Sequence, residues 1–122
     1  MSSLVPSRRM PIVTVSYKAS APATELDTLR AELPEIVSTA LECDEEPYDG
    51  RLKPGDVNLK FAPILPADEA LDYLVEVTTR WTRSRSDNLQ ERSDRIEAAL
   101  GELGLTNFGV WLELATAAWS QR

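Results

Sequence analysis

Apolar and polar residues alternate along four short stretches of the chain, which is the pattern of strands that bury one face. In the first stretch, IVTVSY, β-branched residues alternate with polar ones. In the other three, valine, leucine and aromatic residues alternate with polar ones. The pattern predicts four strands, at residues 12–17, 57–61, 73–78 and 108–114.

Two other segments carry apolar residues at spacings of three and four, the pattern of helices with one buried side. The first helix is expected to begin at Thr24, which forms a capping-box pattern with Asp27, and to continue to Leu41. Pro34 lies inside it and is expected to kink the helix or shift its start, because proline has no amide donor. The second helix is expected to follow the cap-like cluster at residues 86–88.

These elements occur in the order β-α-β and again β-α-β. The two halves match loosely, with IVTVSY against LVEVTT and IVSTAL against IEAALG, as a weak internal repeat. Each right-handed crossover places its helix on the same side of the sheet. The sequence therefore predicts an α+β, two-layer fold, in which tandem β-α-β units give a four-stranded mixed sheet with two helices on one face.

The second face of this sheet is expected to have mixed polarity and no covering helix. Its predicted members share one side of the alternation and are Thr14, Ser16, Asn58, Lys60, Glu76, Thr78, Trp111 and Glu113. A tryptophan and several aliphatic groups on such a face favour association. A closed homo-oligomer is the expected way to cover it.

Composition narrows the function classes. The chain has 122 residues, is 43% hydrophobic and carries 20 acidic against 13 basic residues, a net charge of -7. One domain is expected, and binding to nucleic acid or an anionic membrane is not. The sequence has no histidine and a single cysteine, Cys43, which leaves almost no ligands for zinc or copper, so no metal is expected. No cofactor is expected either. The lone cysteine, the absence of a long apolar run and a non-secretory start favour a cytoplasmic protein.

Three features resemble the tautomerase superfamily, particularly its long-chain members of the 5-carboxymethyl-2-hydroxymuconate isomerase and malonate semialdehyde decarboxylase type. They are the MPIVTV segment at residues 10–15, the tandem β-α-β pattern and the closing LATAAWS. The resemblance covers residues 10–122. It implies a tautomerase/MIF-like fold, a homotrimer with sites at subunit boundaries, and a small anionic oxo- or hydroxy-acid substrate.

The resemblance also implies that Pro11 is the catalytic base. An N-terminal proline presents a secondary amine, and the reference pKa of an α-amino group is about 7.7–8.0. Desolvation and nearby cations lower that pKa and leave a neutral base near physiological pH. Such an amine can remove a proton from a carbon beside a carbonyl and return it elsewhere, which is keto-enol or double-bond isomerisation.

A carboxylate substrate requires cationic partners. The sequence around Arg85, S-R-S-x-x-L-x-x-R, resembles the family's GRS-x-x-x-R segment, so Arg85 is expected to bind the carboxylate and Lys60 to act as an electrophile. Asn58 stands where short members of the family place an arginine. The expected substrate-binding residues are Arg83, Arg80, Lys18, Asn58 and Trp119.

Each of these residues also has a structural interpretation. The arginines can form a solvated basic loop, Lys60 can be an edge charge that deters aggregation, and Trp119 can be a packing anchor. Glu76 and Glu113 can be a carboxylate pair or two solvated residues. Pro11 taken alone is an ordinary strand-entry proline.

Ten residues precede Pro11 in this sequence, and they change the chemistry. Behind Met10 the nitrogen of Pro11 is a tertiary amide, whose lone pair is delocalised into the carbonyl. We therefore divide the chain into residues 1–10, an extension or misassigned leader, and 11–122, a single tautomerase-like domain. Three hypotheses stay open: an isomerase that begins at Pro11, a non-catalytic ligand-binding or scaffolding protein with a genuine extension, and a decarboxylase or hydratase that uses the same site.

Overall fold

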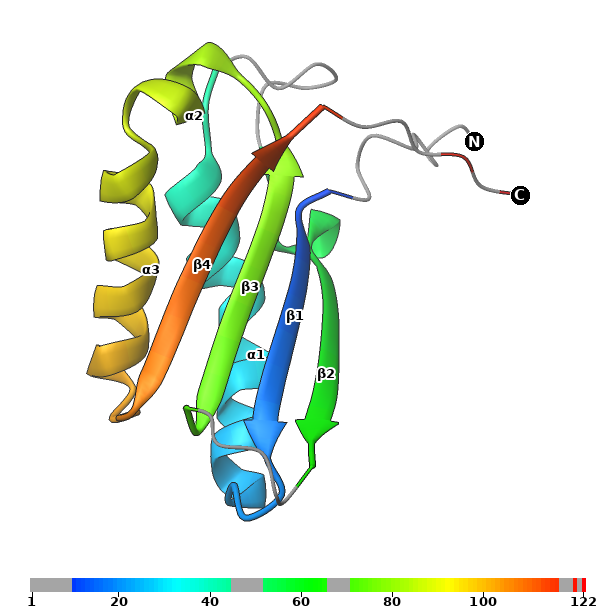
Figure 1. Cartoon of the computed structure of the whole chain (residues 1–122). Helices are drawn as coiled ribbons and strands as arrows, with labels where there is room; N and C mark the ends of the chain where they lie inside the picture. The colour runs from blue at the N-terminus through cyan, green and yellow to red at the C-terminus, as the bar shows by residue number, and fades with distance from the viewer. Residues whose placement is uncertain (1–9, 45–51, 66–70, 117–119, 121) are drawn as a thin grey trace.

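The computed structural model describes residues 10–44, 52–65, 71–116, 120 and 122. Its strands are β1 (Ile12–Lys18), β2 (Asn58–Ile64), β3 (Tyr73–Arg80) and β4 (Phe108–Ala115), in the spatial order β2-β1-β3-β4 (Figure 1). β1 is parallel to β2 and β3 is parallel to β4, whereas β1 and β3 are antiparallel. The predicted four-stranded mixed sheet is confirmed.

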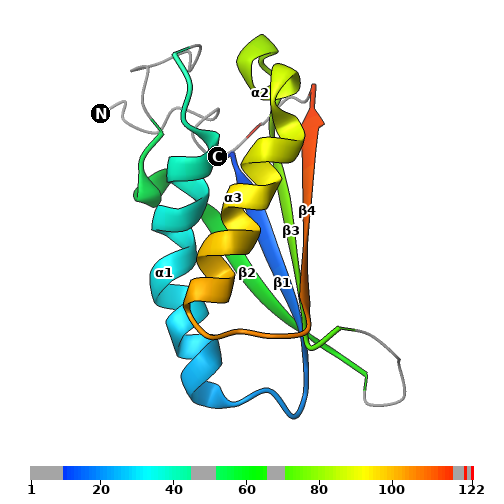
Figure 2. The same cartoon turned by 90° about the vertical axis from the view of Figure 1, so that its left-hand side faces the viewer.

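Two helices, α1 (Ala23–Leu41) and α3 (Leu89–Glu102), lie side by side on one face of the sheet (Figure 2). A short helix, α2 (Arg83–Asp87), links β3 to α3, and a 3-10 turn, η2 (Pro54–Asp56), precedes β2. The expected two-layer arrangement is therefore also confirmed. Within the described residues, no helix is long and apolar enough to span a membrane.

The predicted capping box at the start of α1 is wrong. The N-cap is Pro22, and the helix begins at Ala23 without a side-chain cap, because the amides of Glu25 and Leu26 both donate to the Pro22 carbonyl. Thr24 lies inside the first turn. The helix also continues through Pro34 to Leu41, so that proline does not shift its start.

The second helical segment has an additional turn that the sequence pattern did not predict. Thr82 caps α2, since its hydroxyl accepts a hydrogen bond from the Arg85 amide at 3.1 Å. Asn88 is the N-cap of α3, but its side-chain oxygen accepts from Arg92 Nε at 2.7 Å and not from a helix amide. Gly104, at φ 91°, follows the end of α3 in the left-handed conformation expected there.

The core lies between the sheet and the two helices. Its fully buried members come from β1, β3, α1 and α3, and are Val13, Val15, Val75, Val77, Leu29, Leu33, Val37, Leu41, Ile96 and Leu100. The strand residues among them alternate with the more exposed residues of the other face, as the sequence predicted. Burying this apolar area is the main favourable contribution to folding.

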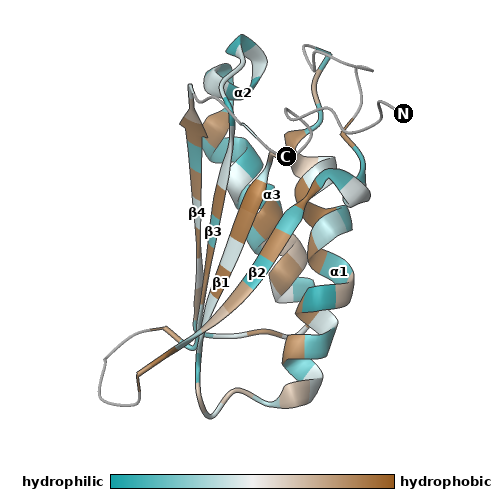
Figure 3. Ribbon diagram, turned by 90° about the vertical axis from the view of Figure 1, so that its right-hand side faces the viewer, coloured by the Kyte–Doolittle hydropathy of each residue, from teal (hydrophilic) through white to brown (hydrophobic). Residues whose placement is uncertain are grey.

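The other face of the sheet is covered by no helix of the described chain (Figure 3). One cross-strand row on it runs Lys60, Thr14, Glu76 and Trp111, and the Trp111 side chain is 60% exposed. The predicted mixed polarity of this face is thus observed. A large exposed tryptophan between charged neighbours is typical of a surface that associates.

Tyr73 anchors α1 to the sheet at the end remote from Pro11, because its phenol donates a hydrogen bond to the Glu25 carboxylate. Burial raises the pKa of Tyr73, and the Glu25 and Asp72 charges raise it further. The folded state therefore favours the neutral phenol. The resulting stabilisation is complete below the unfolded tyrosine pKa of about 10 and is lost as the pH rises above it.

We predict that the free energy of unfolding of Tyr73→Phe is lower than that of the parent protein by about 1 kcal/mol at neutral pH, through loss of this hydrogen bond. Between pH 9 and 11 the parent should lose more stability than the variant, so that the two curves converge. Urea unfolding across this pH range measures both curves. Parallel curves would show that Tyr73 is not the titrating group.

Candidate functional site

The start of β1 lies at the same edge of the sheet as the start of β2 and the ends of β3 and β4 (Figure 1). The backbone N–H of Asn58 donates a hydrogen bond to the Pro11 carbonyl at 2.9 Å, which holds the start of β2 against Pro11. Ile12, the next residue, is paired with Thr78 near the end of β3. The Trp81 amide donates to the Ala115 carbonyl at 3.0 Å and so joins the ends of β3 and β4.

Pro11 is buried in this position, and Met10 before it is 7% exposed. With Met10 attached, the Pro11 nitrogen has no basic electron pair. A chain that begins at Pro11 has a secondary amine at this point, in place of the peptide bond to a buried methionine. In the 122-residue chain this position is buried with Met10 in place.

Arg80 is a cation that the sheet brings to this end. It is the last residue of β3, two residues beyond Thr78, and the strand alternation places it on the uncovered face with Glu76. Its Nε is buried and has no hydrogen-bond partner in the part of the chain that the structure describes. Buried donors are nearly always paired, so this atom is a candidate to bind an external acceptor such as a carboxylate.

Asn58 and Lys60 approach the same end from β2. Asn58 is paired with Ile12 and Lys60 with Thr14, so Lys60 lies two residues farther along the sheet, about 7 Å from the Asn58 position. Both side chains are exposed on the uncovered face. The structure thus brings Pro11, Asn58, Lys60 and Arg80 to one region.

The other expected site residues lie elsewhere. Lys18 ends β1, about 20 Å along the strand from Ile12, and pairs with Asp72 at 3.9 Å. Arg83 is exposed at the start of α2. Trp119 lies outside the described residues, so its expected role stays a prediction.

Arg85 is completely buried, with 0% exposure. Its Nε donates to the Leu41 carbonyl at 2.9 Å and its Nη1 donates to the Arg80 carbonyl at 3.0 Å. The side chain therefore connects the end of α1 to the end of β3. Its expected role in binding a carboxylate stays a prediction.

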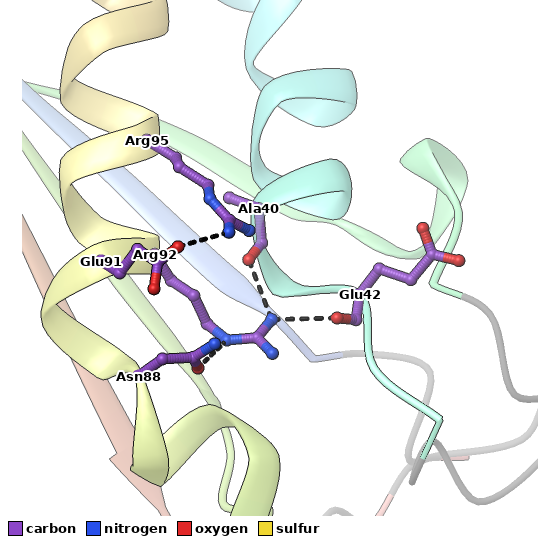
Figure 4. A network of polar contacts seen from close by, with 6 residues as sticks. All are labelled: Ala40, Glu42, Asn88, Glu91, Arg92 and Arg95. Carbon is purple, nitrogen blue, oxygen red and sulfur yellow. Dashed lines mark hydrogen bonds and ion pairs between the residues drawn. The ribbon is translucent and has the colours of Figure 1, made fainter.

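A second buried arginine, Arg92, was not predicted to have any role, although it closes the motif that contains Arg85. Its Nη1 donates to the carbonyls of Ala40 and Glu42 at 3.0 and 2.9 Å (Figure 4). Burial lowers the pKa of the Arg92 guanidinium, and the Arg85 charge acts in the same direction. Together the two arginines satisfy carbonyls at the end of α1, where a positive charge also complements the helix dipole.

Two hollows on the described surface lie away from Pro11. One, of about 260 Å³, lies between α1 and α3 and is lined by Ile36, Ala40 and Ala99 among others. The other, of about 530 Å³, lies between α3 and β4 beside Trp111. Within the described residues there is also no group of three or more Cys, Asp or Glu side chains that could hold a metal ion.

No family model matches the sequence, and no curated protein matches it. Solved structures do match. Malonate semialdehyde decarboxylase matches with a TM-score of 0.66 at 14% identity, over 90% of this chain and 89% of the other. A 5-carboxymethyl-2-hydroxymuconate isomerase from Deinococcus radiodurans R1 matches with a TM-score of 0.61 at 13% identity, over 95% of this chain and 90% of the other.

A macrophage migration inhibitory factor-like protein from Entamoeba histolytica also matches, with a TM-score of 0.56 at 13% identity, over 88% of this chain and 90% of the other. All three proteins belong to the tautomerase superfamily. The expected resemblance and the tautomerase/MIF-like fold are thus confirmed, and at these identities the comparison establishes the fold alone.

We predict that Arg92→Leu lowers the free energy of unfolding by about 1–3 kcal/mol, because the carbonyls of Ala40 and Glu42 lose their donor. Arg95→Leu, one turn later, is the matched control. Its exposed pair with Glu91 has a value of at most about 1 kcal/mol. Urea unfolding compares the two variants, and equal losses would contradict a capping role for Arg92.

Proposed function

We propose that the chain, when it begins at Pro11, is a tautomerase or isomerase of a small carboxylate substrate. The observation that supports this most strongly is that Pro11 and Arg80 lie at the same end of the sheet, with the buried Arg80 Nε lacking a partner among the described residues. A base and an anion-binding cation at one end of the sheet are the two groups that the reaction needs.

In the proposed reaction the neutral Pro11 amine removes a proton from a carbon beside the substrate carbonyl. The electrons of the broken C–H bond pass into an enolate, whose negative charge is stabilised by the cations at the site. Arg80 binds the substrate carboxylate and Lys60 lies within reach as the electrophile. The protonated amine then returns the proton to another atom of the substrate, which restores the free base.

Other residues have supporting roles in the proposal. The backbone N–H of Asn58 holds Pro11 in place through a hydrogen bond to the Pro11 carbonyl. Arg83 can add positive charge from the exposed start of α2. The uncovered face of the sheet supports a closed homo-oligomer, and the family resemblance favours a trimer with sites between subunits. Lys18 lies at the end of β1 that is remote from Pro11. In such an assembly it can therefore contribute only to the site of a neighbouring subunit.

A decarboxylase or hydratase is the second candidate. The structural match to malonate semialdehyde decarboxylase, described for its decarboxylase and hydratase activities, favours it. In that reaction the Pro11 amine acts as a protonated acid. A third candidate, a non-catalytic binding or scaffolding protein, is favoured by the buried Met10, which caps the proline nitrogen in the full chain.

We predict that protein beginning at Pro11 ketonises phenylenolpyruvate and that the 122-residue chain does not. Arg80→Gln in the Pro11 form should lower kcat/KM at least about tenfold, the cost of losing one hydrogen bond to a charged group. Arg95→Gln, on the outer side of α3, is the control and should retain the parent rate. Circular dichroism of every form confirms that it is folded. Equal rates for the 122-residue and Pro11 forms would contradict Pro11 as the base.

The pH dependence of kcat/KM separates isomerase from decarboxylase. A base mechanism loses rate as the pH falls and the amine becomes protonated, whereas an acid mechanism loses rate as the pH rises and the amine loses its proton. We expect the first result with an enol substrate. Intact mass of the natural chain tests the third candidate, because retention of Met1 or Ser2 would favour the scaffolding role.

A further inference from the structure

Arg85 joins the proposed site to the helical layer. Its guanidinium donates to the carbonyl of Arg80 at 3.0 Å and to that of Leu41 at 2.9 Å, and its own amide donates to the Thr82 hydroxyl at 3.1 Å. The side chains of Arg85 and Thr82 are both buried, and the bond to the Arg80 carbonyl is partly buried. The backbone at the end of β3 is therefore held by a buried side chain of α2.

The carbonyl of Arg80 belongs to the residue whose side chain faces the proposed substrate. A hydrogen bond to this carbonyl fixes the orientation of the last peptide group of β3. That orientation sets the direction in which the Arg80 side chain leaves the strand. Small errors in the placement of a catalytic or binding group are costly, because about 1 Å of displacement can lower a rate a hundredfold.

Arg92 provides a matched comparison within the same chain. It is also buried and also donates to carbonyls at the end of α1, Ala40 and Glu42. Its third hydrogen bond goes to Asn88, and among the described residues it bonds to no residue of β3. Both arginines therefore donate to carbonyls at the end of α1. Arg85 in addition donates to the Arg80 carbonyl at the end of β3.

We propose that Arg85 is a positioning residue that acts on the reaction through Arg80. This inference rests on the proposed function and assigns Arg85 a role different from direct carboxylate binding. The guanidinium is suited to it because its planar fork donates to two carbonyls at once. A lysine keeps the positive charge but cannot reproduce that fork.

A double-mutant cycle in the Pro11 form tests the proposal. We expect Arg85→Lys to lower kcat/KM about tenfold in the parent and to have less than a twofold effect when Arg80 is already glutamine. Arg92→Lys should change kcat/KM by less than twofold in either background, although it lowers the unfolding midpoint to a similar extent as Arg85→Lys. All rates are expressed per folded protein, measured by circular dichroism.

A second measurement uses the 122-residue chain and requires no catalysis. The ¹⁵N resonance of Arg80 Nε, assigned by its loss in Arg80→Gln, should shift in Arg85→Lys and stay in place in Arg92→Lys. If Arg85→Lys does not fold, Arg85→Gln, whose amide can donate to one of the two carbonyls, replaces it in both experiments.

Multiplicative effects of Arg85→Lys and Arg80→Gln would overturn the proposal, since they would mean that Arg85 acts on the rate independently of Arg80. An unchanged Arg80 resonance would also overturn it. If the parent Pro11 form has no activity, the proposed function fails, whereas the resonance experiment still decides whether Arg85 positions Arg80.

Discussion

The antiparallel pairing of β1 with β3 is the constraint on which the structure depends. Each half of the chain makes its own parallel pair, β1 with β2 and β3 with β4, and the central pairing joins the halves into one sheet. Because β1 and β3 run in opposite directions, β1 begins where β3 ends. The parallel pairs then bring the start of β2 and the end of β4 to the same place. The region around Pro11 is a direct consequence.

The same pairing determines which cations are available there. Alternation along β3 places Arg80 on the uncovered face with its Nε buried and unpartnered among the described residues, whereas Arg85 and Arg92 turn into the layer between sheet and helices. The arginines from the end of β3 into α3 are therefore divided between a proposed binding role for Arg80 and carbonyl contacts for Arg85 and Arg92. Capping the end of α1 with charged donors also fixes the helices relative to the strand that carries Arg80.

The strands and the two long helices could be predicted from sequence because their apolar residues follow simple periods. The start of α1 could not be predicted in this way. The amides of Glu25 and Leu26 donate to the Pro22 carbonyl, so the helix begins at Ala23 and Thr24 lies inside its first turn. The short helix α2 has no apolar period, so its sequence, RSRSD, gave no signal. For the site, local sequence favoured Arg85 over Arg80. One carbonyl partner of Arg85, that of Leu41, lies 44 positions away, and no local pattern reveals it.

The central claim is that the Pro11 nitrogen, when it is a free amine, is a weakened base held in a buried position beside a cation. Titration of ¹⁵N-labelled Pro11 by NMR, in protein that begins at this residue, measures it most directly. The account predicts a pKa below the ordinary α-amino value of about 7.7–8.0, equal to the acid limb of the kcat/KM profile. A pKa at or above that value, or a rate profile that follows another group, would contradict it.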